Sequence, residues 1–372
     1  MSAPRALVLE PAGNLWGSER VLLDFLGSAV ASPWKIGVCC PPRTPIIGRL
    51  NGLAIPVYTH FVARLHRRSR LVRLRAAAGL LVAALRFRPR LLYVNQAGAT
   101  RIALLVGRML GIPVISHVRL AEDAGYLQSL NAGPDELPLV VCISHYVRSL
   151  FEGPGLDARS KLVVLYDPYL PQLAWNDIRH SDTVDPGPVF CCVGRLTRTK
   201  GQDVVLQAIS HLQREGKVVQ GLFFGTGEPS DPFDHELEEL ATVLGISAQV
   251  KWQGFQEQIP SHIAATAALI CPSHTESLGR VIFEAWDAGT IPVAWAGSGG
   301  PAEVIQASGA GLLYDEQTGP ALARTLERVL DLAPSARQQM VEHGQRWLLE
   351  NCAPDVYSQK MLALWQDAVD LS

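Results

Sequence analysis

Short apolar segments alternate with stretches of helical spacing along most of this 372-residue chain. The apolar segments are RALVL, KIGVCC, RLLYVN, IPVISHV and LPLVVC in the first half, and VFCCV, QGLFF, AQVKWQGF, ALIC and TIPVAWA in the second. Between them, a stretch such as residues 17–29 places Val21, Leu22, Phe25 and Leu26 on one helical face. Apolar strands that alternate with helices are typical of a parallel sheet with helices on both faces. The pattern therefore predicts an α/β protein built from doubly wound parallel sheets.

The length of the chain and one irregular segment predict two such domains. A chain of this length exceeds what one hydrophobic core usually holds. Residues 167–188 are rich in Pro and Asp and lack periodicity, so we expect a linker there. The predicted domains are then 1–166 and 189–345, with a ligand in the crevice at the carboxyl ends of the strands. We expect the helices of residues 346–372 to pack back on the first domain.

Composition excludes several classes of protein. A hydrophobic content of 48% with 18% charged residues argues against disorder. No apolar run reaches the roughly 18 residues that a membrane span needs, and the N-terminus lacks the layout of a secretory signal. The seven cysteines form no CxxC or Cys/His metal pattern, which favours buried thiols in a reducing cytoplasm. We therefore expect a cytoplasmic protein without a bound metal or other cofactor.

Positive charge is concentrated in the first half. Residues 1–165 contain 20 Lys and Arg but only 9 Asp and Glu, which suggests an anionic partner. Between residues 60 and 90, an apolar helical stretch is accompanied by Arg64, Arg67, Arg68, Arg70, Arg73 and Arg75. Such a segment fits anionic lipid headgroups or a polyprenyl-diphosphate acceptor, but a solvated helix remains an equal alternative. Nucleic acid is disfavoured, since no recognition motif or interleaved aromatic residues are present.

Two loops of the second half have the composition of phosphate-binding sites. Arg195 and Lys200 follow an apolar strand in VGRLTRTKGQD, where a guanidinium and an ammonium would suit a diphosphate. Ser277, Leu278 and Gly279 lie between the strand ALIC and a helical run, so their amides would lie at a helix N-terminus. A solvated loop remains an alternative for the first of these two loops.

Glu276 and Glu284 flank the sequence SLGRVIF in otherwise apolar surroundings. Glutamate is rarely buried without a partner. If residues 279–284 are helical, the two carboxylates point to different parts of a ligand, which disfavours a shared-proton catalytic pair. They could each accept hydrogen bonds from the hydroxyls of different sugars, or they could be structural partners of Arg280.

Taken together, the segments GRLTRTKGQDVVLQAI, FGTGE, WQGF, PSHTESLGRVIFEAWDAGTIPVA and GGPAEVI resemble one family in content and order. The sequence resembles the retaining nucleotide-sugar glycosyltransferases of family 4 (glycosyl transferases group 1). The match extends over nearly the whole chain. The resemblance implies the GT-B fold of two Rossmann-like domains, the first binding the acceptor and the second the nucleotide sugar.

The resemblance also implies roles for residues of the second half. Glu276 would hold hydroxyls of the donor sugar, and Glu284 would hold those of the ribose. Arg195 and Lys200, with the amides of Ser277, Leu278 and Gly279, would neutralise the donor diphosphate. Gly225 and Phe255 would belong to the donor site, Phe255 beside the base, although core packing is an equal alternative for its side chain.

In the first half, GNLWGSER resembles the family's glycine-containing loop, with Gly17 near the donor phosphate and Ser18 near the acceptor. Ser18 replaces the more usual second glycine. His117 corresponds to the family's active-site histidine near the donor sugar. Asn95 and Arg119 are assigned to the acceptor.

These observations predict a metal-independent, retaining hexosyltransferase that uses a nucleoside-diphosphate sugar, with UDP or GDP favoured over ADP. The acceptor would be a glycan or lipid-linked saccharide in bacterial surface polysaccharide or glycolipid synthesis. We expect the protein in the cytoplasm, at the inner face of the cell membrane as a peripheral protein. Two alternatives stay open, a transferase with a soluble small acceptor and a catalytically silent sugar-nucleotide-binding protein. A dinucleotide-dependent oxidoreductase is disfavoured, because neither half contains GxGxxG followed by a ribose-binding acid.

Overall fold

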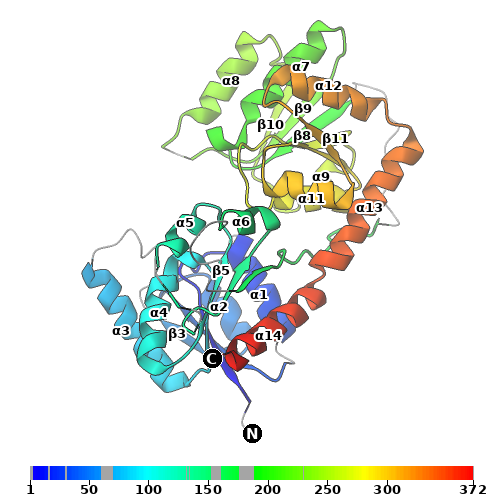
Figure 1. Cartoon of the computed structure of the whole chain (residues 1–372). Coiled ribbons are helices and arrows are strands. Elements are labelled where there is room, and N and C mark those ends of the chain that lie inside the picture. Colours follow the sequence, from blue (N-terminus) through cyan, green and yellow to red (C-terminus); the bar gives the residue numbers. More distant parts are fainter. Residues whose placement is uncertain are drawn as a thin grey trace. The chain divides into compact units, whose positions relative to one another are not determined.

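A computed structural model describes the chain except for residues 1–2, 16, 30–31, 60–69, 131, 134, 152–160, 176–187, 229 and 372, and the side chain of Arg70. The chain forms two compact units (Figure 1). The first comprises Met1–Pro168 and Asn351–Ser372, and the second comprises Tyr169–Glu350.

The first unit contains a seven-stranded sheet in the order β3-β2-β1-β4-β5-β6-β7, with every neighbouring pair parallel. Its strands are β1 (Arg5–Leu9), β2 (Lys35–Cys40), β3 (Val57–Thr59), β4 (Leu91–Val94), β5 (Val114–Val118), β6 (Leu139–Cys142) and β7 (Lys161–Val164). Its helices are α1 (Gly17–Ala29), α2 (Ile46–Gly52), α3 (Arg70–Phe87), η2 (Ala97–Ala99), α4 (Thr100–Leu110), α5 (Asp123–Gln128), α6 (His145–Ser149) and α14 (Pro354–Asp370).

Helices cover both faces of this sheet. The helices α1, α2 and α14 share one core cluster with the sheet, in which Trp365 of α14 makes edge-on ring contacts with Phe25 at 5.3 Å and Trp34 at 5.6 Å. On the opposite face, α3 contacts β1 and β2, and α4 contacts β4 and β5. Residues 351–372 therefore belong to the core of the first unit, although they end the chain.

The second unit contains a six-stranded parallel sheet in the order β10-β9-β8-β11-β12-β13. Its strands are β8 (Val189–Val193), β9 (Gln220–Phe224), β10 (Val250–Gly254), β11 (Ala268–Cys271), β12 (Ile291–Trp295) and β13 (Leu312–Tyr314). Its helices are η5 (Arg198–Lys200), α7 (Gln202–Arg214), α8 (Phe233–Val243), α9 (Ile259–Ile263), α10 (Arg280–Asp287), α11 (Gly300–Ser308), α12 (Gly319–Leu330) and α13 (Pro334–Cys352), the last of which ends beyond the unit boundary.

Both sheets have the strand order of a doubly wound fold, so the predicted fold class of two Rossmann-like parallel sheets is confirmed. The order in which successive strands are added reverses between β1 and β4 in the first sheet and between β8 and β11 in the second. Ligands of such sheets bind beside the carboxyl ends of the strands at this point. Of the helices in the described part, none combines the length and apolar character that crossing a bilayer requires.

Candidate functional site

The predicted site residues gather at the point of reversal in each sheet. In the first unit, Asn95 directly follows β4, and His117 lies in β5, the next strand of the sheet. In the second unit, Arg195 follows β8 by two residues and Glu276 follows β11 by five. Each unit therefore presents its own cluster where a doubly wound sheet binds ligands.

Lys200 and Glu276 form an ion pair in the second unit. Lys200 Nζ lies 2.9 Å from Glu276 Oε1, and the Ser273 hydroxyl donates to Glu276 Oε2 at 2.9 Å. The backbone of Glu276 is fixed as well, because its N–H donates to Ser298 O and its C=O accepts from Gly300 N. Burial lowers the pKa of Lys200 but the charge of Glu276 raises it, and the pKa is raised overall. Lys200 thus stays cationic beside a side chain whose two oxygens are both engaged, so a ligand's hydroxyl would have to share one of them with Lys200 or Ser273.

The N-terminus of α10 lies directly after this pair. Gly279 caps the helix with φ +79°, and a Cβ there would lie 2.5 Å from Pro301 Cγ. Only glycine adopts this backbone without strain. Among the described residues, none accepts a hydrogen bond from the amides of Leu278 or Gly279. Two unsatisfied amides at a helix N-terminus suit a phosphate group.

Glu284 lies within α10, one turn from its start, and carries an unsatisfied oxygen. Its Oε2 atom is buried and has no hydrogen-bond partner among the described residues. Burial raises the pKa of Glu284 to about 7, with Asp287 and Glu276 adding to the rise and Arg280 opposing it. A buried acceptor without a donor is costly in the free protein. The carboxyl is thus prepared to accept hydrogen bonds from a bound hydroxyl group.

Asp287, at the last turn of α10, holds the segment that enters the second unit. Its Oδ2 accepts from the Tyr169 hydroxyl at 2.9 Å and from Gln172 N at 2.8 Å. Its Oδ1 accepts from Trp175 Nε1 at 2.8 Å and, at 3.4 Å, from Leu173 N. Residues 169–175, which the sequence assigned to the linker, are therefore fixed on the second unit. The remaining residues of that predicted linker, up to 187, lie outside the described residues.

The structure shows the surroundings of three other residues that were predicted to bind the sugar-nucleotide donor. Arg195 is exposed and its Nη1 donates to Glu228 at 2.9 Å, so a ligand must exchange that partner. Gly225, at φ +135°, packs on the Gly194 carbonyl so closely that a Cβ would collide with it. Phe255 is 68% exposed, which excludes the core-packing alternative for its ring.

His117 is buried at the end of β5, where it is kept neutral. Its Nδ1 lies 2.7 Å from the Tyr93 hydroxyl, and its Nε2 is buried without a partner among the described residues. Burial, helped by the charge of Arg119, holds its pKa well below the usual range. If Tyr93 donates to Nδ1, then Nε2 carries the proton and can donate to a ligand.

Asn95 and Arg119, predicted to meet the acceptor, are buried and contact each other. Arg119 donates to Asn95 Oδ1 and Asn95 O, both at 3.1 Å, and is ion-paired with Asp167. Burial lowers the pKa of Arg119, but Asp167 together with Tyr357 and Tyr93 raises it by more, so the guanidinium stays charged. In the structure these two residues form a buried pair that ties β4 and β5 to the segment after β7. Direct acceptor contact by these two residues stays a prediction.

Ser18 belongs to a buried polar network that the sequence did not reveal. Its hydroxyl donates to Glu19 and accepts from Gln96, both at 3.0 Å, and Gln96 also donates to Glu10. Burial raises the pKa of Glu10 to about 7, with the charge of Glu19 adding to the rise. Gly17 is exposed beside this network, and a Cβ there would meet no atom within 4 Å. Two acids and two amides thus surround the turn after β1.

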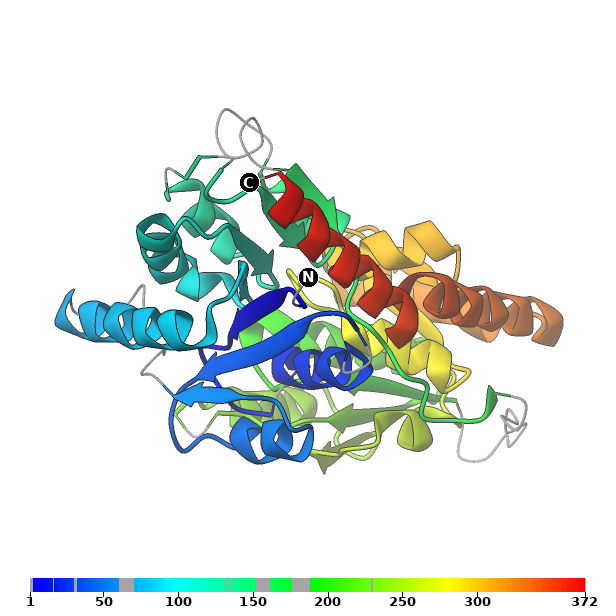
Figure 2. The same cartoon turned by 90° about the horizontal axis from the view of Figure 1, so that it is seen from below.

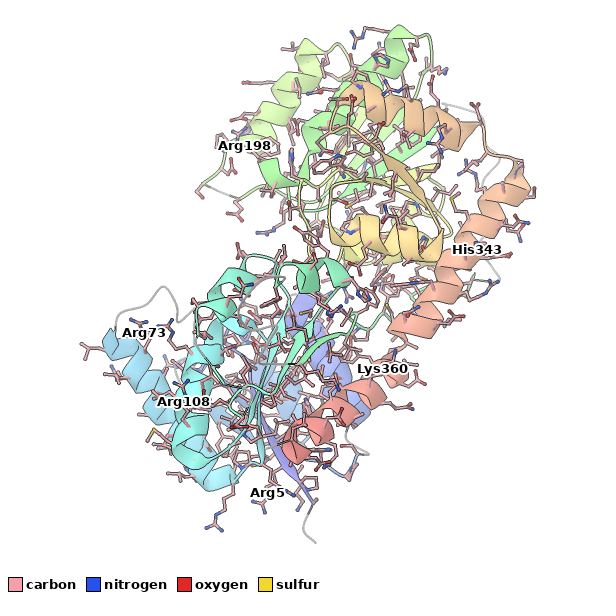
Figure 3. All side chains as sticks on the ribbon, in the orientation of Figure 1. Arg5, Arg73, Arg108, Arg198, His343 and Lys360 are labelled. Carbon is pink, nitrogen blue, oxygen red and sulfur yellow. The ribbon has the colours of Figure 1, made fainter. Side chains whose placement is uncertain are left out.

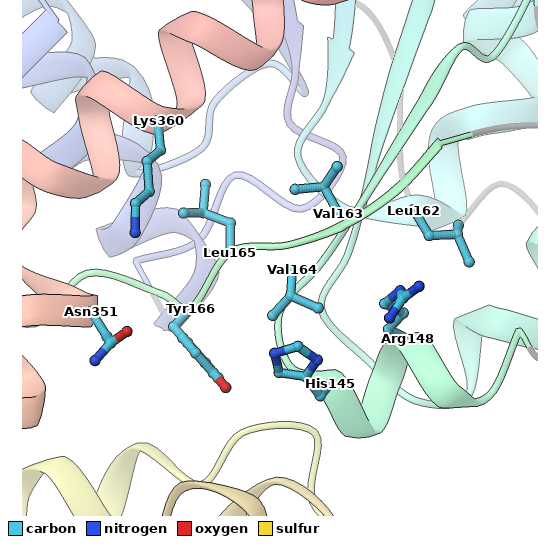
Figure 4. A pocket seen from close by; sticks show the side chains of 9 residues that line it. All are labelled: His145, Arg148, Leu162, Val163, Val164, Leu165, Tyr166, Asn351 and Lys360. Carbon is cyan, nitrogen blue, oxygen red and sulfur yellow. The ribbon is translucent and has the colours of Figure 1, made fainter. Parts of the chain in front are cut away.

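A separate hollow opens beside β7 in the first unit (Figure 4). Its rim includes Arg148 of α6 and Lys360 of α14, with His145 near Arg148. The nine residues that line it include no acid. The hollow therefore offers a second place in this unit for an anionic group.

Two predictions concern metals and the arginine-rich segment. In the described part of the chain, no group of three or more His, Cys, Asp or Glu residues is placed to hold a metal ion. Arg64, Arg67 and Arg68 lie outside the described residues, while Arg70 begins α3 and Arg73 and Arg75 lie in its first two turns.

The functional residues that the sequence did not predict are mostly acidic residues and the groups that donate hydrogen bonds to them. Glu10 directly follows β1, and Gln96 is the second residue after β4. Polar residues at the ends of apolar strands were therefore a usable signal for both. Asp287 gave no such signal, because its four donors come from residues more than 110 positions earlier.

Residues 174–347 match the family described as Glycosyl transferases group 1. The lipopolysaccharide core biosynthesis glycosyltransferase LpsE of Rhizobium meliloti (strain 1021) is 30% identical over 183 residues, 49% of this chain and 51% of LpsE. The 2-deoxystreptamine glucosyltransferase of Streptomyces kanamyceticus is 32% identical over 166 residues, 44% of this chain and 41% of that enzyme. The chain thus matches about half, or less, of the length of these relatives.

A longer match at lower identity involves the GDP-mannose-dependent alpha-(1-6)-phosphatidylinositol monomannoside mannosyltransferase of Mycobacterium tuberculosis (strain ATCC 25618 / H37Rv). It is 28% identical over 290 residues, 71% of this chain and 69% of the relative.

Solved structures match the whole chain. Anabaena Alr3699/HepE in complex with UDP and glucose superposes with a TM-score of 0.76 at 19% identity, over 98% of this chain and 100% of that one. A glycosyltransferase from Rickettsia africae ESF-5 superposes with a TM-score of 0.81 at 17% identity, over 100% of both chains. The chain therefore has the GT-B fold of these proteins, and its second unit matches the Glycosyl transferases group 1 family.

Proposed function

We propose that this protein is a retaining glycosyltransferase that moves a hexose from a nucleoside-diphosphate sugar to a glycan or lipid-linked saccharide. The second unit would bind the donor and the first unit the acceptor. Such a division agrees with the separate cluster of polar residues in each unit.

The observation that carries this proposal is the unsatisfied Glu284 Oε2 beside the N-terminus of α10. A ribose has two adjacent hydroxyls, and both can donate to one carboxylate. The amides of Leu278 and Gly279 lie about one helical turn before Glu284, so a diphosphate attached to that ribose would lie against them. Glu276 lies beyond them and would receive the hydroxyls of the donor sugar.

Stabilising the departing diphosphate is the main electrostatic demand of this reaction. Lys200 stays cationic beside Glu276, and Arg195 would exchange Glu228 for a phosphate oxygen. These cations and the helix N-terminus can oppose the charge without a metal ion. His117, neutral and with an unsatisfied Nε2, would hold a hydroxyl of the transferred sugar rather than take a proton.

With retention by front-face attack, the acceptor oxygen bonds to the anomeric carbon on the side from which the phosphate leaves. The bond between this carbon and the phosphate oxygen breaks, and the acceptor's proton passes to that phosphate oxygen. No protein nucleophile is needed, in keeping with the neutral state of His117 and the pairing of Glu276 with Lys200.

The kind of acceptor and nucleotide is proposed from the relatives. LpsE is named for lipopolysaccharide core biosynthesis and the mycobacterial relative for a phosphatidylinositol monomannoside, so a lipid-linked saccharide at the inner membrane face is favoured. UDP occurs in the HepE complex and GDP-mannose in the name of the mycobacterial relative, which favours these nucleotides over ADP. The acid-free hollow between α6 and α14 would suit an anionic group of the acceptor.

A thermal-shift screen with UDP-, GDP- and ADP-sugars in the presence of EDTA tests the proposal. Binding to the folded state raises stability by RT ln(1 + [L]/Kd), so ligand at a hundredfold excess over Kd gives about 2.7 kcal/mol. We expect one nucleotide class to raise the melting temperature, and Lys200→Met to reduce the shift. No shift with any sugar nucleotide would contradict the proposal. Binding without transfer to any acceptor would favour a catalytically silent binding protein.

A soluble small acceptor is the second candidate. It is favoured by the similarity to the 2-deoxystreptamine glucosyltransferase. Transfer to water-soluble aminocyclitols or sugars, with none to lipid-linked saccharides, would decide for this candidate.

A further inference from the structure

The helix α3 of the first unit has apolar side chains on two faces. On one face Leu80, Ala84 and Phe87 are buried against the sheet. On the other, large apolar side chains are spaced three, eight and three residues apart, which places them on one stripe along the helix. This exposed stripe consists of Leu71, Leu74, Val82 and Leu85, with exposed fractions from 55% to 74%. A helix that is apolar all round is normally covered on both sides.

The neighbouring helix α4 widens this exposed apolar area. Leu105 and Met109 of α4 are exposed by 43% and 62%. The two helices pack against each other, and both views show α3 on the outside of the unit (Figures 1 and 2). Six of the thirteen large exposed apolar side chains in the described residues lie on these two helices, so they are concentrated there rather than scattered. We call this area, residues 71–86 and 101–109, the α3–α4 face.

The charge around the α3–α4 face has one sign. Residues 25–121 contain fifteen Lys and Arg and no Asp or Glu. Beside the stripe, the cations are Arg75 and Arg86 of α3 and Arg101 and Arg108 of α4 (Figure 3 labels Arg108). Arg108 is paired with Glu136 at 2.6 Å, and Arg101 lies over the Tyr126 ring. The apolar stripe is thus bordered by arginines, and Glu136 is the acid paired with one of them.

We propose that the α3–α4 face binds the surface of an anionic lipid bilayer. The leucines and Met109 would enter the boundary between headgroups and acyl chains, and the arginines would contact lipid phosphates. Long arginine side chains can reach the headgroups while their neighbours are buried. This inference rests on the proposed function for its biological meaning. It adds the surface by which the protein would contact the membrane that holds the acceptor. It also moves the contact from the arginine-rich segment 64–75 to two packed helices.

Two other occupants fit the same face less well. A second copy of the chain would bring the same arginines against these, and like charges facing each other oppose association. A single-stranded nucleic acid would need aromatic side chains for base stacking, whereas the exposed stripe consists of leucine and valine.

The test is co-sedimentation of the whole protein with vesicles. One set contains phosphatidylglycerol and phosphatidylcholine in equal amounts, and the other contains phosphatidylcholine alone. We expect binding to the anionic set only, weakened by raising the salt concentration from 0.1 M to 0.5 M. The paired substitutions Leu71→Ser with Leu74→Ser should weaken binding at least about tenfold. The pair Arg75→Gln with Arg86→Gln should weaken it by roughly fivefold for each arginine removed.

Matched controls come from the second unit. Val243→Ser removes an apolar side chain that is 83% exposed on α8, and Arg324→Gln removes an exposed cation on α12. Both controls should bind vesicles like the wild type, and circular dichroism should show that all variants are folded.

Absent binding to anionic vesicles, or undiminished binding by both paired variants, would overturn the inference. So would a dimer in sedimentation velocity that Leu71→Ser with Leu74→Ser abolishes. Sugar-nucleotide binding is measured on the same samples. If sugar-nucleotide binding persists while vesicle binding fails, only the membrane inference is contradicted. If vesicle binding persists while sugar-nucleotide binding fails, only the proposed function is contradicted.

Discussion

Glu284→Gln should stabilise the free protein while weakening its binding of the donor. The wild-type carboxyl is buried with Oε2 unsatisfied, and burial raises its pKa from 4.5 to about 7. Glutamine has nearly the same shape and carries no charge. The substitution therefore removes the cost of burying a carboxylate, but it also replaces one of the two charged acceptor oxygens that the ribose would use with an NH2 donor.

The effect on stability has a defined pH dependence. Between pH 4.5 and about 7, the folded state binds more protons at Glu284 than the unfolded state, so the wild type loses stability as the pH rises. The change of pKa corresponds to at most about 3 kcal/mol, fully lost above pH 8. Glu284→Gln lacks this loss. Its advantage over the wild type should thus grow from near zero at pH 4.5 to at most about 3 kcal/mol at pH 8.5.

The effect on binding has the opposite sign. A hydrogen bond to a charged group contributes about 1.5–3 kcal/mol, so losing the carboxylate should weaken donor binding by about 10- to 100-fold. Wild-type affinity should rise as the pH passes through about 7, since the ionised carboxylate accepts both ribose hydroxyls. The affinity of Glu284→Gln should be nearly independent of pH over this range.

Urea denaturation and calorimetry at pH 6 and pH 8.5 measure both effects. Calorimetry should use the sugar nucleotide, whose diphosphate has no titrating group near neutral pH. Glu239→Gln, an exposed glutamate on α8, serves as the matched control and should change neither quantity. The reasoning is refuted if Glu284→Gln binds the donor as tightly as the wild type, or if it is no more stable than the wild type at pH 8.5.

Three further predictions concern other residues. Gly225→Ala should lower the free energy of unfolding by roughly 3 kcal/mol or more, because the new Cβ collides with the Gly194 carbonyl at a positive φ. The control Gly17→Ala should leave the free energy of unfolding unchanged, and equal urea midpoints for the two variants would contradict this prediction. Asp287→Asn should cost about 2–4 kcal/mol and speed hydrogen exchange in residues 169–175, and unchanged exchange there would mean that other contacts hold this segment. His117→Gln should lower the transfer rate by at least about 100-fold while changing donor affinity less than about threefold, a split that a loss of folding would not produce.

The sequence predicted the interior strands well and the sheet edges poorly. Nine interior strands appeared as apolar runs, because a strand buried on both faces is apolar throughout. The tenth predicted strand, β10, lies at a sheet edge and alternates between buried and more exposed residues. The three strands without such a run, β3, β7 and β13, all lie at sheet edges and contain three or four residues. The side chains of β3 and β7 are partly exposed, so these strands need no apolar run, whereas β13 is mostly buried but has only three residues.

The candidate site was predictable where a motif lies within one loop. Glu276, Gly279 and Glu284 lie on a single loop and helix, and the helix begins at Arg280, close to the expected position. The network of Glu10 with Gln96 and the pairing of Arg119 with Asp167 join residues 86 and 48 positions apart, which no local pattern reveals. The exposed stripe of α3 was hidden for a different reason, because an apolar run does not show which of its faces the fold covers.

A crystal structure of the protein with the sugar nucleotide that binds in the screen tests the central claim most directly. We expect the ribose hydroxyls to lie within hydrogen-bond distance of Glu284 Oε2. The phosphates should lie beside Lys200 and accept hydrogen bonds from the amides of Leu278 and Gly279. A nucleotide bound elsewhere in the chain, with Glu284 Oε2 still without a partner, would contradict it.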